Sequence, residues 1–151
     1  MPFELRDAGP EDAPALADIH LRARAAAGDA FPPPAHADEE LLPHLLQDVL
    51  PVAEVRLLLR DGVPVGYATL EGDLLADLYV APDEQGSGAG TVLLDDAKAR
   101  RPEGLRLWVF ESNCAARGFY ERRGFVVVGG TDGDNDEGAP DLLMRWPGAD
   151  R

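Results

Sequence analysis

Residues 78–94, LYVAPDEQGSGAGTVLL, run from an apolar strand through a proline turn into a glycine-rich loop and then into a helix. Gly86, Gly88 and Gly90 leave this loop without Cβ atoms, so successive backbone N–H groups can converge on an anion. The loop also leads into a helix N-terminus, whose partial positive charge favours phosphate. The stretch therefore predicts a strand–loop–helix unit that binds a phosphate-bearing ligand.

The spacing of the glycines distinguishes between kinds of phosphate loop. A Walker loop needs Gly-Lys-Ser/Thr, which the chain lacks. A dinucleotide fingerprint, GxGxxG, counted from Gly86 needs its third glycine at the position that Thr91 occupies. The pattern that fits is QxxGxG over residues 85–90. It resembles the acetyl-coenzyme A loop of the GNAT superfamily of N-acetyltransferases.

A second motif follows downstream, in residues 113–125. Its pattern is NxxAxxFYxxxGF, which resembles the segment that forms the other half of the coenzyme site in that superfamily. On a helix, Asn113, Ala116 and Tyr120 share one stripe that can face the coenzyme, and Gly124 ends the helix. Two motifs in the expected order indicate the same family.

The resemblance implies how the cofactor is held. Leu78 and Val80 would act through backbone groups that hold the pantetheine arm as an added strand. The family often has arginine in place of Gln85, so one charge contact can be absent here. Asn113 either contacts the coenzyme arm or simply caps its helix. The expected cofactor-binding residues are Leu78, Tyr79, Val80, Gln85, Gly86, Ser87, Gly88, Ala89, Gly90, Thr91, Asn113, Ala116 and Phe119.

Acetyl transfer from a thioester needs a proton donor for the departing thiolate and a base for the amine. In the family the tyrosine at the position of Tyr120 commonly gives that proton, so we expect Tyr120 as general acid, with a core aromatic as the alternative. A carboxylate of pKa about 4 deprotonates an ammonium of pKa about 10 poorly without a water relay. Asp77, which interrupts an apolar strand, is our candidate base, because some amine-acetylating relatives have a carboxylate in this neighbourhood.

Trp108 and His36 are the candidate substrate-binding residues. Trp108 lies on the strand face opposite Leu107 and Val109 and can face the cleft, with plain packing beneath a helix as the alternative. His36 lies in a loop that often lines the acceptor side in this superfamily, with an inert surface role as the alternative. His20 is expected to be structural.

The composition is that of one compact enzyme domain over residues 1–151. With 45% hydrophobic residues the chain can bury a core without disulfides or metals. Residues 131–138, TDGDNDEG, resemble half of a calcium loop, but Glu137 replaces the needed glycine and no glutamate follows at the right distance. We therefore expect no metal.

The net charge of −14, from 28 acidic against 14 basic residues, makes nucleic acid a poor partner. Such a field would draw in cations, including amines, or serve only solubility. No run approaches a membrane span of roughly 20 apolar residues, and no N-terminal segment resembles a signal peptide. We expect a cytoplasmic protein with no membrane partner, and the abundance of Ala, Gly, Pro and Arg suggests a bacterial genome.

Hydrophobic periodicity predicts the order of the elements. Strands are expected over residues 3–7, 55–59, 64–70, 74–80, 105–110, 125–129 and 142–146. Helices are expected over residues 11–27, 38–50, 91–101 and 113–123. The GNAT resemblance implies an α/β (α+β) fold, with a mixed, mostly antiparallel central sheet of about seven strands and about four helices on both faces.

These observations predict an N-acetyltransferase that passes an acetyl group from acetyl-CoA directly to a primary amine. The expected acceptor is a small molecule such as a polyamine, amino acid or aminoglycoside. The alternative is a CoA-binding regulatory or interaction module that kept the fold and lost turnover. A homodimer stays open as the assembly.

Overall fold

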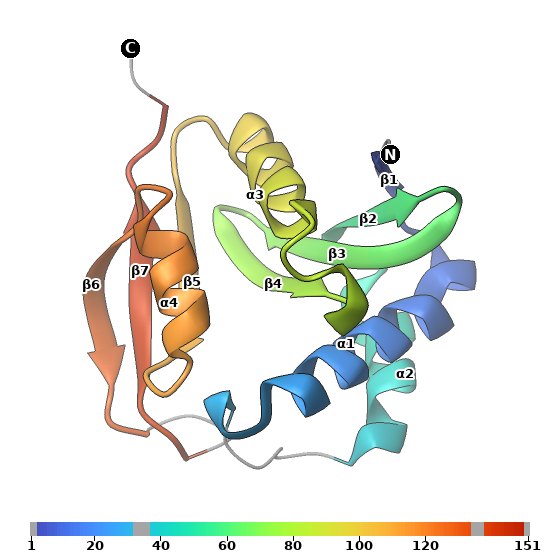
Figure 1. Ribbon diagram of the computed structural model, residues 1–151, viewed down its shortest axis with the longest axis horizontal. Helices are drawn as coiled ribbons and strands as arrows, with labels where there is room; N and C mark the ends of the chain where they lie inside the picture. Colours follow the sequence, from blue (N-terminus) through green and yellow to red (C-terminus); the bar gives the residue numbers. More distant parts are fainter. Residues whose placement is uncertain (1–2, 32–36, 134–137, 150–151) are drawn as a thin grey trace.

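A seven-stranded sheet forms the centre of the protein, in the order β1-β2-β3-β4-β5-β7-β6 (Figure 1). The structure is a computed structural model that describes residues 3–31, 37–133 and 138–149. Neighbouring strands are antiparallel except for β4 and β5, which are parallel. The strands are β1 (Phe3–Asp7), β2 (Glu54–Arg60), β3 (Val63–Glu71), β4 (Leu74–Val80), β5 (Leu105–Phe110), β6 (Val126–Thr131) and β7 (Asp141–Trp146). The mixed, mostly antiparallel sheet predicted from the sequence is confirmed.

Helices cover both faces of the half-sheet β1–β4. The helices are α1 (Ala13–Ala27), α2 (Leu41–His44), α3 (Ala89–Arg100) and α4 (Cys114–Glu121). On one face, Leu16 and Ile19 of α1 are buried against Leu57 and Tyr67 of the sheet. On the other, residues of α3 are buried in a second cluster that also includes Tyr120 of α4 and strands β5 and β7. The expected layers of helix, sheet and helix are therefore present, and Figure 1 shows α4 beside the second half of the sheet.

The second helix differs from its expected form. We predicted a helix over residues 38–50, with a break caused by Pro43 as the alternative, and the structure has a 3-10 turn at Asp38–Glu40, then α2, then a π-helical turn at Leu45–Val49. The amide of Leu50 donates to the carbonyl of Leu45, 2.9 Å away, which is the longer π-type bond. Pro43 sits near the start of the segment, where its lack of an amide hydrogen is tolerated. The apolar face still packs, because Leu45 and Val49 are buried.

Strands β4 and β5 diverge. Their only paired residues are Leu74 and Arg106, at the start of β4. Over the rest of β4, the backbone edge that faces β5 has no strand partner among the described residues. This divergence opens the centre of the sheet to ligands.

A β-bulge in β4 determines which side chains face the opening. Leu75 pairs with Leu70 of β3, but the next pair is Asp77 with Thr69, so Ala76 is an extra residue. Leu75 faces the core beneath α3. Without the bulge Asp77 would share that face, whereas with it Asp77 faces the α1 side. No helix formed by the described residues has the length and hydropathy of a membrane span.

Candidate active site

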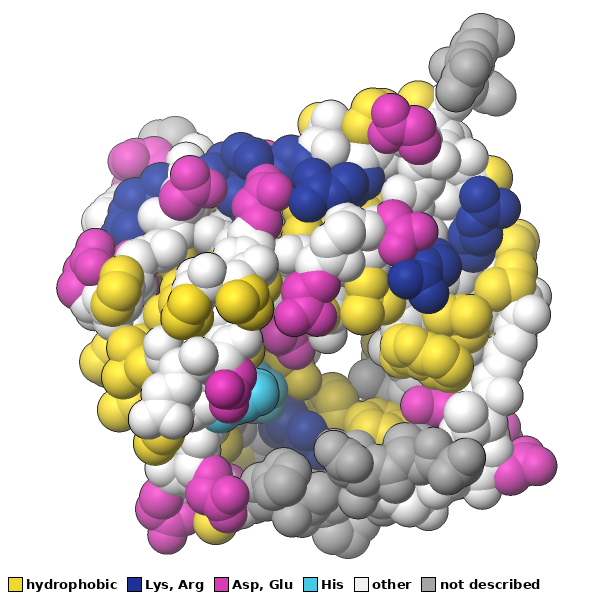
Figure 2. Space-filling view, turned by 180° about the vertical axis from the view of Figure 1, so that it is seen from behind, with side chains coloured by type: hydrophobic (Ala, Val, Ile, Leu, Met, Phe, Trp, Pro, Cys, Tyr) yellow, Lys and Arg dark blue, Asp and Glu magenta, His cyan; other side chains and the backbone are white. Residues whose placement is uncertain are grey.

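A cleft of about 1180 Å³ lies where β4 and β5 diverge. Its walls come from residues 75–79 of β4, residues 107–110 of β5, the α1 and α2 segments, and one side of the α4 segment from Asn113 to Tyr120. Figure 2 shows the molecule hollowed near its centre, with hydrophobic, acidic and histidine side chains around the hollow. The sheet therefore provides a site that two separate parts of the chain enclose.

The glycines of the glycine-rich loop serve two different structural purposes. Gly86 and Gly88 have φ angles of +83° and +96°, and a Cβ on either would meet no atom within 4 Å. Gly90 instead lies in α3, where a Cβ would come within 3.4 Å of the Phe119 ring. Two glycines are thus needed for backbone conformation, and the third for close packing against α4.

The loop leaves backbone donors exposed at the start of α3. The first helical bond of α3 runs from the Val92 amide to the Gly88 carbonyl over 3.0 Å. Within the described chain, no acceptor receives the amide hydrogens of residues 88–91. These free donors, the open glycine backbone and the helix dipole fit a pyrophosphate group. Ser87 donates its hydroxyl to the Glu84 carbonyl, and the Gln85 side chain is exposed beside the loop.

The two sequence motifs meet in space. Asn113 accepts a hydrogen bond from the Ala116 amide over 3.2 Å, so its capping role is present, and both residues also line the cleft. At the other end of α4, Phe119 packs on Gly90 of the glycine-rich loop. The α4 segment therefore joins the cleft to the start of α3.

Tyr120 is both a core aromatic and a cleft residue. Its ring contacts Phe119 and Phe125 at centroid distances of 5.2 and 5.4 Å. It also lines the cleft, which Phe119 and Phe125 do not. Burial, with a smaller contribution from the charge of Asp77, raises the pKa of Tyr120 above its ordinary value. The phenol therefore holds its proton at neutral pH.

Asp77 and Trp108 line the same cleft from β4 and β5. Burial raises the pKa of Asp77 above its ordinary range, which makes it a stronger base than a surface carboxylate. Trp108 is 47% exposed, so plain packing beneath a helix is wrong for this residue. The reason is that the described part of the chain places a helix, α4, on only the other face of β5. His36 lies outside the described residues, as do residues 134–137 of the acidic loop.

Sequence reasoning missed His20 as a cleft residue. Its Nδ1 atom lies 3.0 Å from the Tyr67 hydroxyl oxygen, and its ring centroid lies 4.2 Å from that of Tyr79. Burial lowers the pKa of His20 to about 4, so the imidazole is neutral at pH 7. A helical histidine among apolar residues gives no sign of such a position, because its partners come from β3 and β4.

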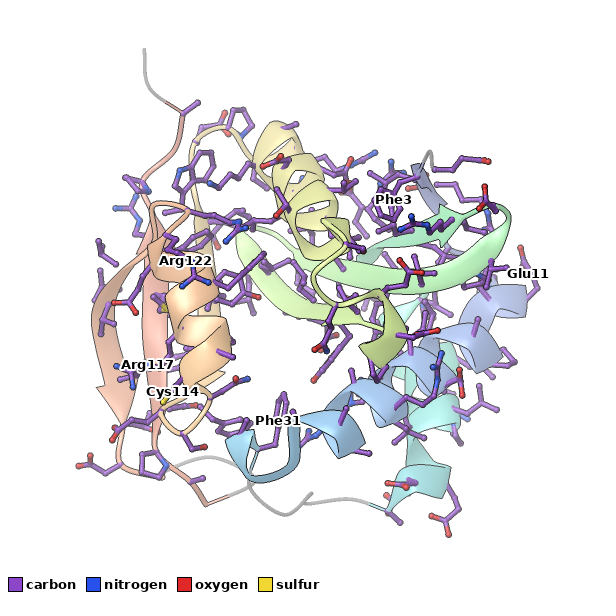
Figure 3. The ribbon with its side chains drawn as sticks, viewed as in Figure 1. Phe3, Glu11, Phe31, Cys114, Arg117 and Arg122 are labelled. Atoms are coloured by element: carbon purple, nitrogen blue, oxygen red, sulfur yellow. The ribbon has the colours of Figure 1, made fainter. Side chains whose placement is uncertain are left out.

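An aromatic and basic cluster closes one end of the cleft. The ring centroid of Phe31 lies 6.0 Å from that of Phe110 and 6.4 Å from that of Tyr79. The guanidinium carbon of Arg24 lies 4.5 Å from the Phe31 ring centroid. Figure 3 shows Phe31 at the end of α1, directed towards the space between α1 and α4. Ser112, after β5, donates its hydroxyl to the Ala30 carbonyl over 2.8 Å. The end of α1 is therefore tied to the second half of the sheet.

Acidic side chains line the α2 side of the cleft. They are Asp38, Glu39, Glu40 and Asp48. Within the described ranges, no three His, Cys, Asp or Glu side chains are grouped to hold a metal ion. The α2 side of the cleft is therefore acidic, whereas the residues of the glycine-rich loop lie outside the cleft lining.

Comparison with known proteins agrees with this geometry. Residues 51–127 match the family model described as "Acetyltransferase (GNAT) domain". The peptidyl-lysine N-acetyltransferase YjaB of Salmonella typhimurium is 37% identical over 105 residues, which cover 69% of this chain and 71% of that protein. The solution structure of apo YjaB from Escherichia coli superposes with a TM-score of 0.80 at 32% identity, covering 99% and 100% of the two chains. PaiA N-acetyltransferase from Thermoplasma acidophilum, solved in complex with coenzyme A, shares the fold with a TM-score of 0.69 at 20% identity, covering 97% and 99%.

Proposed function

The chain belongs to the GNAT family of acetyltransferases, and from this membership we propose that its cleft transfers the acetyl group of acetyl-CoA directly to a primary amine. The observation that carries the proposal is the cleft between β4 and β5, which has free loop amides near one end and Tyr120 and Asp77 in its walls. When bound, acetyl-CoA supplies the acetyl thioester. The residues of this chain position it and move protons.

Binding of the cofactor would use backbone groups above all. The free amides of residues 88–91 would hold the pyrophosphate. Leu78, Tyr79 and Val80 pair with β3 on one side only, so their other edge can bond the pantetheine arm like an added strand. An N–H on that edge would also stabilise the negative charge that develops on the thioester oxygen.

Two side chains would handle protons. Tyr120 keeps its phenolic proton at neutral pH and lines the cleft, so it can protonate the departing thiolate as general acid. Asp77 has a raised pKa, so the difference between its pKa and that of an ammonium group is smaller than for an ordinary carboxyl group. It would accept the amine proton through water as general base.

For the acceptor, a lysine side chain is the first candidate, because YjaB and YiaC, 34–37% identical to this chain, are named peptidyl-lysine N-acetyltransferases. A small cationic amine, as the sequence suggested, is the second candidate. The acidic side chains along the α2 side of the cleft favour it equally, because they attract an ammonium group in either form. Trp108 would contact the acceptor in both cases.

Two linked experiments test this function. A thermal-shift titration should show stabilisation by acetyl-CoA of about 2.7 kcal/mol at 100 times its dissociation constant, with ATP and NAD as phosphate-bearing controls. An acetylation assay should then compare lysine-containing peptides with polyamines and free amino acids. A shift with a nucleotide but none with acetyl-CoA would refute the cofactor assignment, and acetyl-CoA binding without transfer to any amine would refute the reaction.

A further inference from the structure

Arg123, in the turn after α4, is fixed against the first turn of α3. Its Nη2 donates to the Thr91 hydroxyl over 2.9 Å, and its Nη1 donates to the Phe119 carbonyl over 3.0 Å. The guanidinium carbon also lies 3.9 Å from the centre of the Phe119 ring. These three contacts hold one positive charge beside the free amides of the glycine-rich loop.

This arrangement has no acidic partner within the described chain. Seven other arginines of the described chain pair with carboxylates, namely Arg6, Arg22, Arg56, Arg60, Arg100, Arg101 and Arg106. Arg123 forms no such pair, although acidic residues outnumber basic ones two to one, 28 against 14. Arg117, Arg122 and Arg145 likewise have no carboxylate partner among the described residues, but Arg123 is the one whose guanidinium contacts the first turn of α3, at Thr91.

The surroundings of Arg123 add further positive charge. The start of α3 carries the positive end of the helix dipole, where a cation is unfavourable. The ammonium of Lys98 lies 2.6 Å from the Arg123 carbonyl oxygen. Burial lowers the pKa of Lys98, the charge of Asp95 opposes this, and the charge of Arg123 lowers the pKa further. An anion bound beside these groups would reduce these repulsions.

We propose that Arg123 is a cofactor-positioning residue that contributes the charge contact to the pyrophosphate of coenzyme A which the chain lacks at Gln85. The inference rests on the proposed function of the cleft and adds one residue to the group that would bind the cofactor. A guanidinium has five N–H donors, and the bonds to Thr91 and Phe119 leave others for phosphate oxygens. Thr91 and Phe119 would serve to aim it.

The test compares Arg123→Gln with Arg122→Gln. Both variants remove one arginine charge from adjacent positions, but Arg122 is exposed and makes none of these contacts. Calorimetric titration with coenzyme A, repeated at several NaCl concentrations, gives the dissociation constant and its salt dependence. We expect Arg123→Gln to weaken binding about ten-fold and to flatten the salt dependence, with Arg122→Gln within about two-fold of wild type.

Salt dependence separates a charge contact from a structural role. Loss of packing alone would weaken binding without changing the slope against salt, and that result would overturn the inference. If Arg123→Gln fails to fold, Arg123→Lys carries the test: it must keep the wild-type salt dependence if charge is what matters. Wild-type protein that binds no coenzyme A would refute the proposed function itself, whereas unchanged binding in Arg123→Gln refutes this inference alone.

Discussion

The Nδ1 atom of His20 lies 3.0 Å from the hydroxyl oxygen of Tyr67, and this pair joins α1, in the wall of the cleft, to β3. Because burial lowers the pKa of His20 to about 4, the folded protein resists protonation there. The unfolded chain takes up that proton near pH 6.5. The free energy of unfolding therefore falls as the pH drops from about 6.5 to about 4, and no such loss arises above pH 6.5.

The first prediction follows from this linkage. His20→Gln should lose less stability than wild type between pH 6.5 and 4, with a difference of up to about 3 kcal/mol. Urea unfolding at a series of pH values measures it, and other titrating groups are common to both proteins. Parallel stability curves for the two proteins would show that His20 does not titrate as described.

The second prediction concerns the general acid. Tyr120→Phe keeps the ring contacts with Phe119 and Phe125 but removes the proton donor. Turnover should fall about 100-fold, with the dissociation constant of acetyl-CoA unchanged within about two-fold. Steady-state kinetics and calorimetry measure the two quantities. Unchanged turnover would remove Tyr120 from the mechanism.

The third prediction concerns Asp77. Asp77→Asn should lower turnover about 100-fold and remove the acidic limb of the pH–rate profile, because a base must be deprotonated to act. That limb should lie above the ordinary carboxyl pKa, in line with the raised pKa of Asp77. At pH 7 the variant should be at least as stable as wild type, since it removes a charge that burial disfavours. A variant that is inactive because it is unfolded would contradict this.

The fourth prediction separates the glycines of the loop. Gly88→Ala places a Cβ on a left-handed residue and should cost about 1–2 kcal/mol of stability, although it meets no neighbour. Gly90→Ala gains helix propensity of about 1 kcal/mol but presses on the Phe119 ring, so its net change should stay within about 1 kcal/mol. Chemical denaturation measures both. Equal losses would mean that packing, not backbone conformation, limits the loop.

Local sequence patterns predicted the regular elements well. Strands β4 and β5 have the predicted bounds, because each is a short apolar run bounded by glycine or polar turns. The two motifs located the phosphate loop and α4 because each is contiguous in sequence. Their meeting through Phe119 and Gly90 followed only from the resemblance.

Features that depend on long-range contacts were not predictable. The extra residue Ala76 in β4 is visible only once the β3 register is known. His20 enters the cleft because Tyr67, 47 residues away, holds its ring. For Trp108 the sequence left both a cleft-facing position and packing under a helix open, since one sequence does not tell which half of a sheet its helices cover. Arg123 became informative only when its contact with Thr91, 32 residues earlier, was seen.

The divergence of β4 from β5 also has a mechanical consequence. It divides the sheet into two lobes, with β1–β4 in one and β5–β7 in the other, and the strands of the two lobes pair only at Leu74 and Arg106. A ligand that bonds along the open edge of β4 while touching α4 spans both lobes. Binding would then stiffen the protein far from the loop, and amide hydrogen exchange should slow on the β5 side as well as on the β4 side.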